Sequence, residues 1–148
     1  MNYRHAFHAG NQADVLKHVV LVALLEALRG KAKPFAALDL HAGIGRYALA
    51  AEAAKTGEYV DGIARIEGET GAEAHAPAAV ARYLELVRGF NPSGRLEIYP
   101  GSPRLIRALM RPEDRLTLVE LHPEDNARLR AEFAGDDDQR LIEQAPLL

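Results

Sequence analysis

The first thirty residues carry an apolar pattern with helical spacing. Asn11 followed by Asp14 predicts the start of a helix, because an oxygen-bearing cap and an acidic residue in the first turn both stabilise that end. We expect the helix to run to Arg29 and to end at Gly30, a residue that tolerates the left-handed closing conformation. Six apolar residues fall on one face: Leu16, Val20, Ala23, Leu24, Ala27 and Leu28. Val19, Val22 and Leu25 widen this stripe, which predicts a helix buried on more than one side.

Beyond the helix, short apolar runs alternate with segments of helical spacing. The clearest strands are 35–40 and 116–121, both continuous apolar runs bounded by turn residues. Further strands are predicted at 96–99 and 140–142, and helices at 46–55, 79–90, 102–110 and 123–133. Ser102 before Pro103 favours a capping serine with proline at the first helical position. The alternation predicts an α/β fold with parallel strands joined by right-handed crossovers.

Composition adds few restrictions to this picture. Of the 148 residues, 48% are hydrophobic and 26% are charged, as is ordinary for a cytoplasmic globular domain. The longest uninterrupted apolar run, 19–25, is far shorter than a membrane span requires, and no signal-peptide pattern follows Met1. Cysteine is absent, which excludes disulfides and thiolate metal sites. The net charge of −3 argues against strong overall attraction to nucleic acid, although residues 1–55 hold seven basic and only four acidic side chains.

The most informative chemical feature is a glycine-bearing turn after the strand at 35–40. Asp39 is followed by Gly43 and Gly45, and ligands of open parallel sheets bind at such turns, beyond the carboxyl ends of the strands. Glycines provide the permissive backbone and leave room for backbone N–H groups to approach a ligand. The turn therefore favours a nucleoside-type ligand.

An acidic residue that binds the ribose is expected about 20 residues after such a turn, at the end of the next strand. Glu120 closes the strand at 116–121 but lies much farther from Gly45. The spacing is restored if 46–95 is an inserted, mostly helical subdomain, since Ser102 then opens the crossover helix 18 residues before Glu120. Residues 1–45 and 96–148 would form the main domain.

Three other classes of site compete with this interpretation. Gly43, Gly45 and Ala48 also match the nicotinamide-dinucleotide fingerprint, with Glu67 as its acid, although 61–66 is a poor buried strand. His5 and His8 have a spacing found in metal sites, but no acidic or cysteine cluster accompanies them. Gly101-Ser102-Pro103 lacks the flanking glycines of a hydrolase nucleophile elbow.

Several longer blocks of sequence resemble one family closely. They are Tyr3-Arg4-His5-x-Phe7-His8-Ala9-Gly10-Asn11-x-Ala13-Asp14-Val15-Leu16-Lys17-His18, Leu38-Asp39-x-His41-Ala42-Gly43-x-Gly45-Arg46-Tyr47, Thr56-Gly57-Glu58-Tyr59, Gly62-Ile63-Ala64-Arg65-Ile66, Tyr99-Pro100-Gly101-Ser102-Pro103 and Glu120-Leu121-His122-Pro123. The chain resembles the bacterial 23S ribosomal RNA adenine-N6-methyltransferases of the RlmJ family over nearly its whole length.

The resemblance implies a Rossmann-like methyltransferase with a small helical subdomain inserted after the first strand. It implies that S-adenosyl-L-methionine is bound by His18, His41, Ser102 and Glu120 together with the turn at Gly43 and Gly45. It also implies that Tyr3, with Arg4 beside it, lies near the 23S ribosomal RNA substrate, where an aromatic ring and a positive charge suit an unstacked base.

Two departures from the family bear on activity. Pro146 and Leu147 stand where the family has an Asp-Gly pair near the cofactor's adenine. The family's Asp-Pro-Pro-Tyr motif, whose Asp holds the adenine amino group and whose Tyr stacks on the flipped base, does not occur in the 148 residues. We therefore assign no catalytic residue, and a non-catalytic RNA- or cofactor-binding fragment stays an alternative. The strand at 35–40 should lie in mid-sheet, so its open apolar edge predicts self-association.

Overall fold

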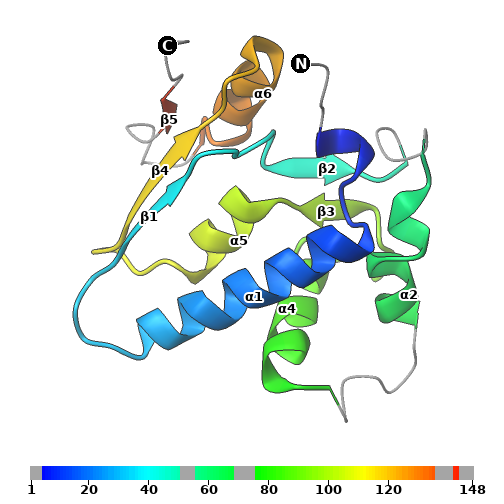
Figure 1. Cartoon of the computed structure of the whole chain (residues 1–148), viewed down its shortest axis with the longest axis horizontal. Coiled ribbons are helices and arrows are strands. Elements are labelled where there is room, and N and C mark those ends of the chain that lie inside the picture. The colour runs from blue at the N-terminus through cyan, green and yellow to red at the C-terminus, as the bar shows by residue number, and fades with distance from the viewer. Residues whose placement is uncertain (1–4, 51–55, 69–75, 136–141, 144–148) are drawn as a thin grey trace.

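The computed structural model describes residues 5–50, 56–68, 76–135 and 142–143. A short 3-10 turn, η1 (His5–Phe7), precedes the long helix α1 (Gln12–Arg29), as Figure 1 shows in blue. The side chain of Asn11 accepts a hydrogen bond from the N–H of Asp14, so the predicted cap is confirmed. Gly30 follows the helix with a φ of −64°, so the predicted left-handed ending is wrong.

The predicted burial of α1 is right for Val22 and Leu25 but wrong for the main stripe, because the helix is rotated relative to our expectation. Its inner face consists of Asp14, Val15, His18, Val22 and Leu25. The six residues of the predicted inner stripe are all exposed. The hydrophobic pattern misled because two polar residues, Asp14 and His18, occupy the inner face and have partners there.

The main sheet is parallel, as the alternation predicts. Strand β1 (Ala36–Asp39) pairs with β4 (Arg115–Val119), which pairs with β5 (Ile142–Glu143), in the order β1-β4-β5. Within this sheet β1 is therefore an edge strand, with one partner among the described residues. The strands predicted at 35–40, 116–121 and 140–142 are confirmed to within a few residues.

The segment after the glycine turn differs from prediction. Residues 46–48 form strand β2 (Arg46–Ala48), not the start of a helix, and β2 pairs antiparallel with β3 (Ile98–Pro100). Tyr47 and Tyr99 face each other in this register and are both fully buried, which explains why a strand forms here. Residues 51–55 of the predicted helix lie outside the described residues.

In its described parts, the segment between β2 and β3 is mostly helical. It contains the 3-10 turn η3 (Glu58–Val60), α2 (Ile63–Gly68) and α4 (Ala78–Gly89), which confirms the helix predicted at 79–90. Gly62 lies against the backbone at Gly10 and Asn11, where a Cβ would collide, so this segment packs directly on the start of α1. The division of the chain into a main domain and an insertion at 46–95 stays a prediction.

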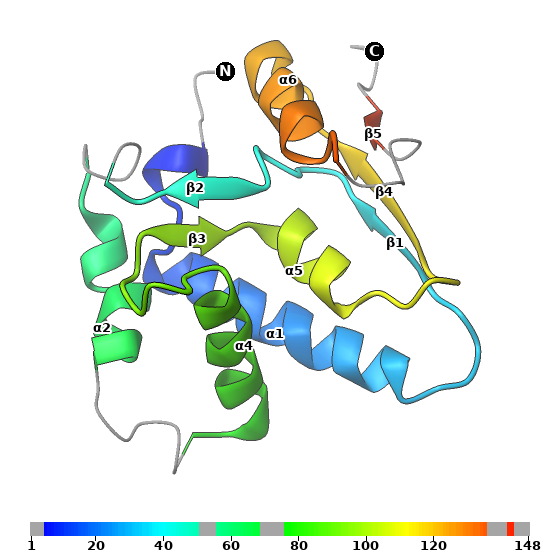
Figure 2. The ribbon, with the colours of Figure 1, turned by 180° about the vertical axis from the view of Figure 1, so that it is seen from behind.

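Two further helices complete the architecture, α5 (Ser102–Leu109) and α6 (Pro123–Glu132). Both were predicted, but the N-cap of α5 is Gly101 rather than Ser102. In both views α5 lies between β1 and α1, and it contacts each of them (Figures 1 and 2). The continuous core includes Leu105 and Leu109 from α5, Leu116 and Leu118 from β4, and Val22 and Leu25 from α1. None of the helices in the described ranges is both long and apolar enough to cross a membrane.

Candidate cofactor site at the carboxyl end of the sheet

The glycine turn leaves β1 in a conformation that depends on its two glycines. Gly43 and Gly45 have φ values of +63° and +80°, which L-residues with a Cβ rarely adopt. A Cβ at Gly43 would collide with the hydroxyl of Tyr47, and one at Gly45 would lie 3.3 Å from both Leu129 and Phe133. The turn is therefore pressed between the buried Tyr47 ring and the end of α6.

Glu120 lies directly against this turn. Its Oε2 accepts a hydrogen bond of 2.8 Å from the N–H of Gly43, and its Oε1 accepts one of 2.8 Å from the N–H of His122. The two bonds fix the plane of the carboxylate, while each oxygen keeps a further lone pair. Glu120 thus reaches the glycine turn although it lies 75 residues after Gly45 in the sequence. This contact is what we expect if the segment 46–95 is an insertion.

Asp39 and Ser102 form a second polar pair at the same edge. The hydroxyl of Ser102 donates to Asp39 Oδ2 at 2.6 Å, and the N–H of His41 donates to Asp39 Oδ1 at 3.1 Å. Ser102 therefore uses its hydroxyl to bind the acid at the end of β1 and not to cap α5. The His41 side chain is exposed, whereas Ser102 and Asp39 are half-buried.

The structure thus brings Gly43, Gly45, Ser102, Glu120 and the backbone of His41 together where β1 and β4 end. Backbone bonds tighten this assembly: the N–H of Ala42 donates to the carbonyl of Val119, and that of Gly101 donates to the carbonyl of Gly45. The result is a group of acceptors and one hydroxyl beside a glycine turn, which suits the hydroxyl and amino groups of a nucleoside.

His18 lies in the core beside Tyr99. Its side chain has no exposed surface, and its Nδ1 lies 2.8 Å from the Tyr99 hydroxyl. Tyr83 donates to Tyr99 at 3.0 Å. When Tyr99 in turn donates to Nδ1, a neutral His18 carries its proton on Nε2. Nε2 has no hydrogen-bond partner among the described residues and lies 3.7 Å from Asp14 Oδ1. Burial, the dominant cause, lowers the pKa of His18 to about 3.

Asp14 is the anchor of the buried polar face. Its carboxylate accepts a hydrogen bond from the N–H of Gly10 at 3.1 Å, and contacts His5 Nε2 at 3.2 Å and Lys17 Nζ at 2.6 Å. Burial alone would raise the pKa of Asp14. The His5 hydrogen bond and the charges of His18, His5 and Lys17 together outweigh this effect and hold the pKa well below its usual range. The His5 ring packs edge-on against Tyr47, 5.5 Å between centroids, so Asp14 links the N-terminal segment to the residue beneath the glycine turn.

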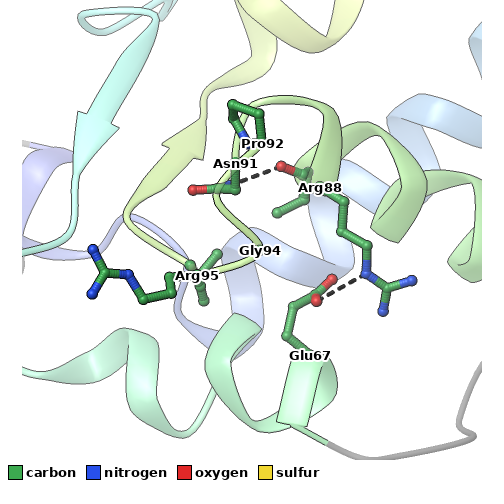
Figure 3. A pocket seen from close by; sticks show the side chains of 8 residues that line it. Glu67, Arg88, Asn91, Pro92, Gly94 and Arg95 are labelled. Carbon is green, nitrogen blue, oxygen red and sulfur yellow. Dashed lines mark hydrogen bonds and ion pairs between the residues drawn. The ribbon is translucent and has the colours of Figure 1, made fainter.

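The described part of the molecule has cavities both at the glycine turn and away from it. A cavity of about 240 Å³ is lined by Ile44 of the turn together with Arg46, Ile98 and Glu132. One of about 290 Å³ is lined by Glu67, Arg88, Asn91 and Arg95, and Figure 3 shows Arg88 pointing toward Glu67 across it. Arg88 Nε lies 3.0 Å from Glu67 Oε2. Glu67 sits on α2 rather than at a strand end, and β2 replaces the helix that a dinucleotide turn needs. The nicotinamide alternative is therefore wrong.

The remaining sequence candidates divide into two groups. Among the described residues, no group of three or more His, Asp and Glu side chains is arranged to hold a metal ion. His8 is instead bonded to Glu58, 3.0 Å from Nδ1 to Oε2. Tyr3, Arg4, Pro146 and Leu147 lie outside the described residues.

Sequence reasoning missed two residues of this region as site members. Asp39 had a visible signal, since it stands at the end of the strand that precedes the glycine turn. Asp14 had only the signal of a helix-start acid, and its role as the anchor of His5 and His18 depends on tertiary packing that no local pattern encodes.

Comparison with known proteins identifies the family of this chain. Residues 32–145 match the family described as "Ribosomal RNA large subunit methyltransferase D, RlmJ". Ribosomal RNA large subunit methyltransferase J of Escherichia coli is 51% identical over 142 residues, which are 95% of this chain and 49% of that protein. The protein of the same name from Haemophilus influenzae is 46% identical, over 92% of this chain and 48% of its own length. The chain therefore spans about half the length of the curated relatives it matches.

A solved structure extends the agreement to three dimensions. A Legionella pneumophila protein of family DUF519 superimposes with a TM-score of 0.77 at 34% identity, over 93% of this chain and 48% of the other. This likeness confirms the predicted α/β, Rossmann-like methyltransferase fold class. Sequence and structure together show that this chain belongs to the RlmJ family of ribosomal RNA large subunit methyltransferases.

Proposed function

We propose that this chain forms the S-adenosyl-L-methionine-binding part of an enzyme that methylates an adenine N6 of 23S ribosomal RNA. The observation that carries the proposal is the contact between Glu120 and the glycine turn, 2.8 Å from Oε2 to the N–H of Gly43. This contact joins the two parts of the expected nucleoside site across the 46–95 segment. Family membership supplies the reaction class.

The residues present fit this cofactor. The two Glu120 oxygens, each with a spare lone pair, would accept the ribose hydroxyls. Asp39 and Ser102 would bind the amino-acid end, since a carboxylate and a hydroxyl suit an ammonium and a carboxylate group. The cofactor, when bound, supplies an electrophilic methyl group on its sulfonium. The contribution of the chain is to hold it in a fixed orientation, which is the main catalytic device for such a transfer.

His18 and His41 differ in exposure, and we therefore propose different roles for them. The His41 imidazole is exposed beside the turn and is free to close over the cofactor. His18 has no exposed surface, so it would support the site indirectly through its hydrogen bond with Tyr99. It would contact the cofactor through Nε2 only after the packing around it shifts. For Tyr3 and Arg4 we keep the RNA-contacting role that the family resemblance implies, and we assign no catalytic base to the 148 residues.

Calorimetric titration with S-adenosylhomocysteine tests the cofactor site. We expect saturable binding, weakened about 10- to 100-fold by Glu120→Ala, because a charge-assisted pair of hydrogen bonds contributes roughly 1.5–3 kcal/mol. Glu67→Ala, which removes an acid from the α2 cavity, serves as the matched control and should bind normally. Glu120→Gln separates loss of charge from loss of the bonds to Gly43 and His122.

NAD provides the competing ligand in the same titration. Tighter binding of NAD, or an unchanged S-adenosylhomocysteine affinity in a folded Glu120→Ala variant, would overturn the assignment. A melting curve of each variant without ligand establishes that it is folded.

A further inference from the structure

Tyr47 is a fully buried tyrosine whose hydroxyl points at the glycine turn. The residue belongs to β2, is 1% exposed and lies opposite the buried Tyr99 of β3. Its hydroxyl accepts a hydrogen bond of 3.4 Å from the N–H of Ile44, the residue between the two glycines of the turn. A phenylalanine would fill the same core space without the cost of burying a hydroxyl, so the oxygen itself calls for an explanation.

The turn rests on this oxygen. A Cβ built on Gly43 would collide with the Tyr47 hydroxyl, whereas the next atom of the ring, Cζ, would be 3.5 Å away, an ordinary contact distance. One oxygen atom therefore occupies the space that a side chain at residue 43 would need. Gly43 is also the residue whose N–H donates to Glu120 Oε2 at 2.8 Å. A shift of the turn would lengthen this bond, and hydrogen bonds tolerate little lengthening.

The Tyr47 ring also borders the start of α5. A Cβ at Gly101 would lie 3.1 Å from Tyr47 Cε2 and 3.1 Å from the carbonyl oxygen of Gly45. The N–H of Gly101 donates to that same carbonyl at 2.9 Å. Gly101 directly precedes Ser102, whose hydroxyl binds Asp39. One ring therefore contacts both segments of the candidate cofactor site, and its size sets the spacing between them.

We propose that Tyr47 is a positioning residue for the cofactor site. Its hydroxyl is the stop against which Gly43 rests, and its ring holds the turn at a fixed distance from Ser102. Because Tyr47 is buried, it acts through the backbone of the turn and does not touch the ligand. The identity of that ligand rests on the proposed function, whereas the contact between residues 43 and 47 can be tested without any ligand.

Titration with S-adenosylhomocysteine measures the effect on binding. Tyr47→Phe keeps the ring and removes only the stop, so we expect binding to weaken about 3- to 10-fold, the range for loss of one neutral hydrogen bond. The melting temperature of the unliganded variant should fall by less than about 4 °C. Tyr59→Phe is the matched control, because this tyrosine packs beside Gly10 and not under the turn, and it should bind normally.

The collision at Gly43 provides a second test, which needs no ligand. Gly43→Ala should lower the melting temperature by at least about 6 °C, because its methyl group meets the Tyr47 oxygen and its φ of +63° is strained. Adding Tyr47→Phe should recover about half of this loss, since only the backbone strain remains. Gly45→Ala is the control. Its Cβ would meet Leu129 and Phe133 instead, so Tyr47→Phe should recover none of its loss.

The two measurements separate the positioning role from the proposed function. If Gly43→Ala does not fold alone, recovery of folded protein by Tyr47→Phe is the supporting result. Normal S-adenosylhomocysteine binding by Tyr47→Phe would overturn the positioning role, and so would a Gly43→Ala loss that Tyr47→Phe leaves unchanged. A natural chain that binds no S-adenosylhomocysteine would overturn the proposed function, and the double variant would still show whether the hydroxyl sets the turn.

Discussion

On the inner face of α1, Asp14 and His18 are buried, whereas on its outer face Leu16 and Leu24 are exposed. The inner polar groups have partners: Gly10, His5 and Lys17 for Asp14, and Tyr99 for His18. The outer leucines face solvent. Hydrophobic spacing alone therefore does not identify the buried face of this helix, because polar side chains whose partners lie in the core can occupy that face instead.

The largest effect is expected from breaking the polar network of the inner face. Asp14→Ala removes the acceptor of the Gly10 N–H and the anion beside His5 and His18, and loss of one partner of a buried pair costs about 3–5 kcal/mol of unfolding free energy. Urea denaturation measures this. Asp61→Ala removes an exposed carboxylate and should change the unfolding free energy by less than about 0.5 kcal/mol. Equal stability of the two variants would mean that Asp14 is not an anchor.

A comparison of adjacent leucines tests the two faces directly. Leu25 is 3% exposed and Leu24 is 59% exposed. Leu25→Ala should lower the free energy of unfolding by about 3 kcal/mol, the usual cost of a core cavity. Leu24→Ala should cost less than about 0.5 kcal/mol in the isolated chain. If Leu24→Ala proved the more damaging, the rotation of α1 described here would be wrong.

The same two faces explain what the sequence could and could not predict. Strands β1 and β4 and helices α4 and α6 carry strong local patterns, and their existence was predicted to within a few residues. The rotation of α1 was not, because Asp14 and His18 count as polar in any periodicity although tertiary partners satisfy them. Strand β2 was missed because Arg46 and Ala48 flank a single buried Tyr47, and only pairing with Tyr99 makes that segment a strand.

Around the glycine turn, the local backbone geometry could be predicted from the sequence, whereas the contacts assembled from distant segments could not. The glycine turn is legible in the sequence, since Gly43 and Gly45 need positive φ. The contact between Glu120 and Gly43 could be inferred only by supposing an insertion between them. The pairing of Ser102 with Asp39 was not foreseen, because a serine before a proline is ordinarily interpreted as a helix cap.

The smallest effect that sharpens the comparison is the pH dependence of stability. The pKa of His18 is lowered by burial to about 3 in the folded chain, against roughly 6.5 when unfolded. Between these values the unfolded state binds a proton that the folded state does not, so stability should fall as the pH falls, by about 1.4 kcal/mol per pH unit. Below about pH 4 the depressed pKa of Asp14 adds to the loss in the same direction, because its paired carboxylate must be protonated.

Urea denaturation of the natural chain and of His18→Gln between pH 7 and 4.5 isolates the contribution of this one histidine. The glutamine variant keeps an acceptor for Tyr99 but has no titratable ring, so its stability should decline less steeply by about 1.4 kcal/mol per pH unit below pH 6. Leu24→Gln, on the outer face, should retain the full slope of the natural chain. Parallel slopes for all three proteins would mean that His18 is protonated as easily in the folded chain as in the unfolded one, and the inner face of α1 would then be open to water.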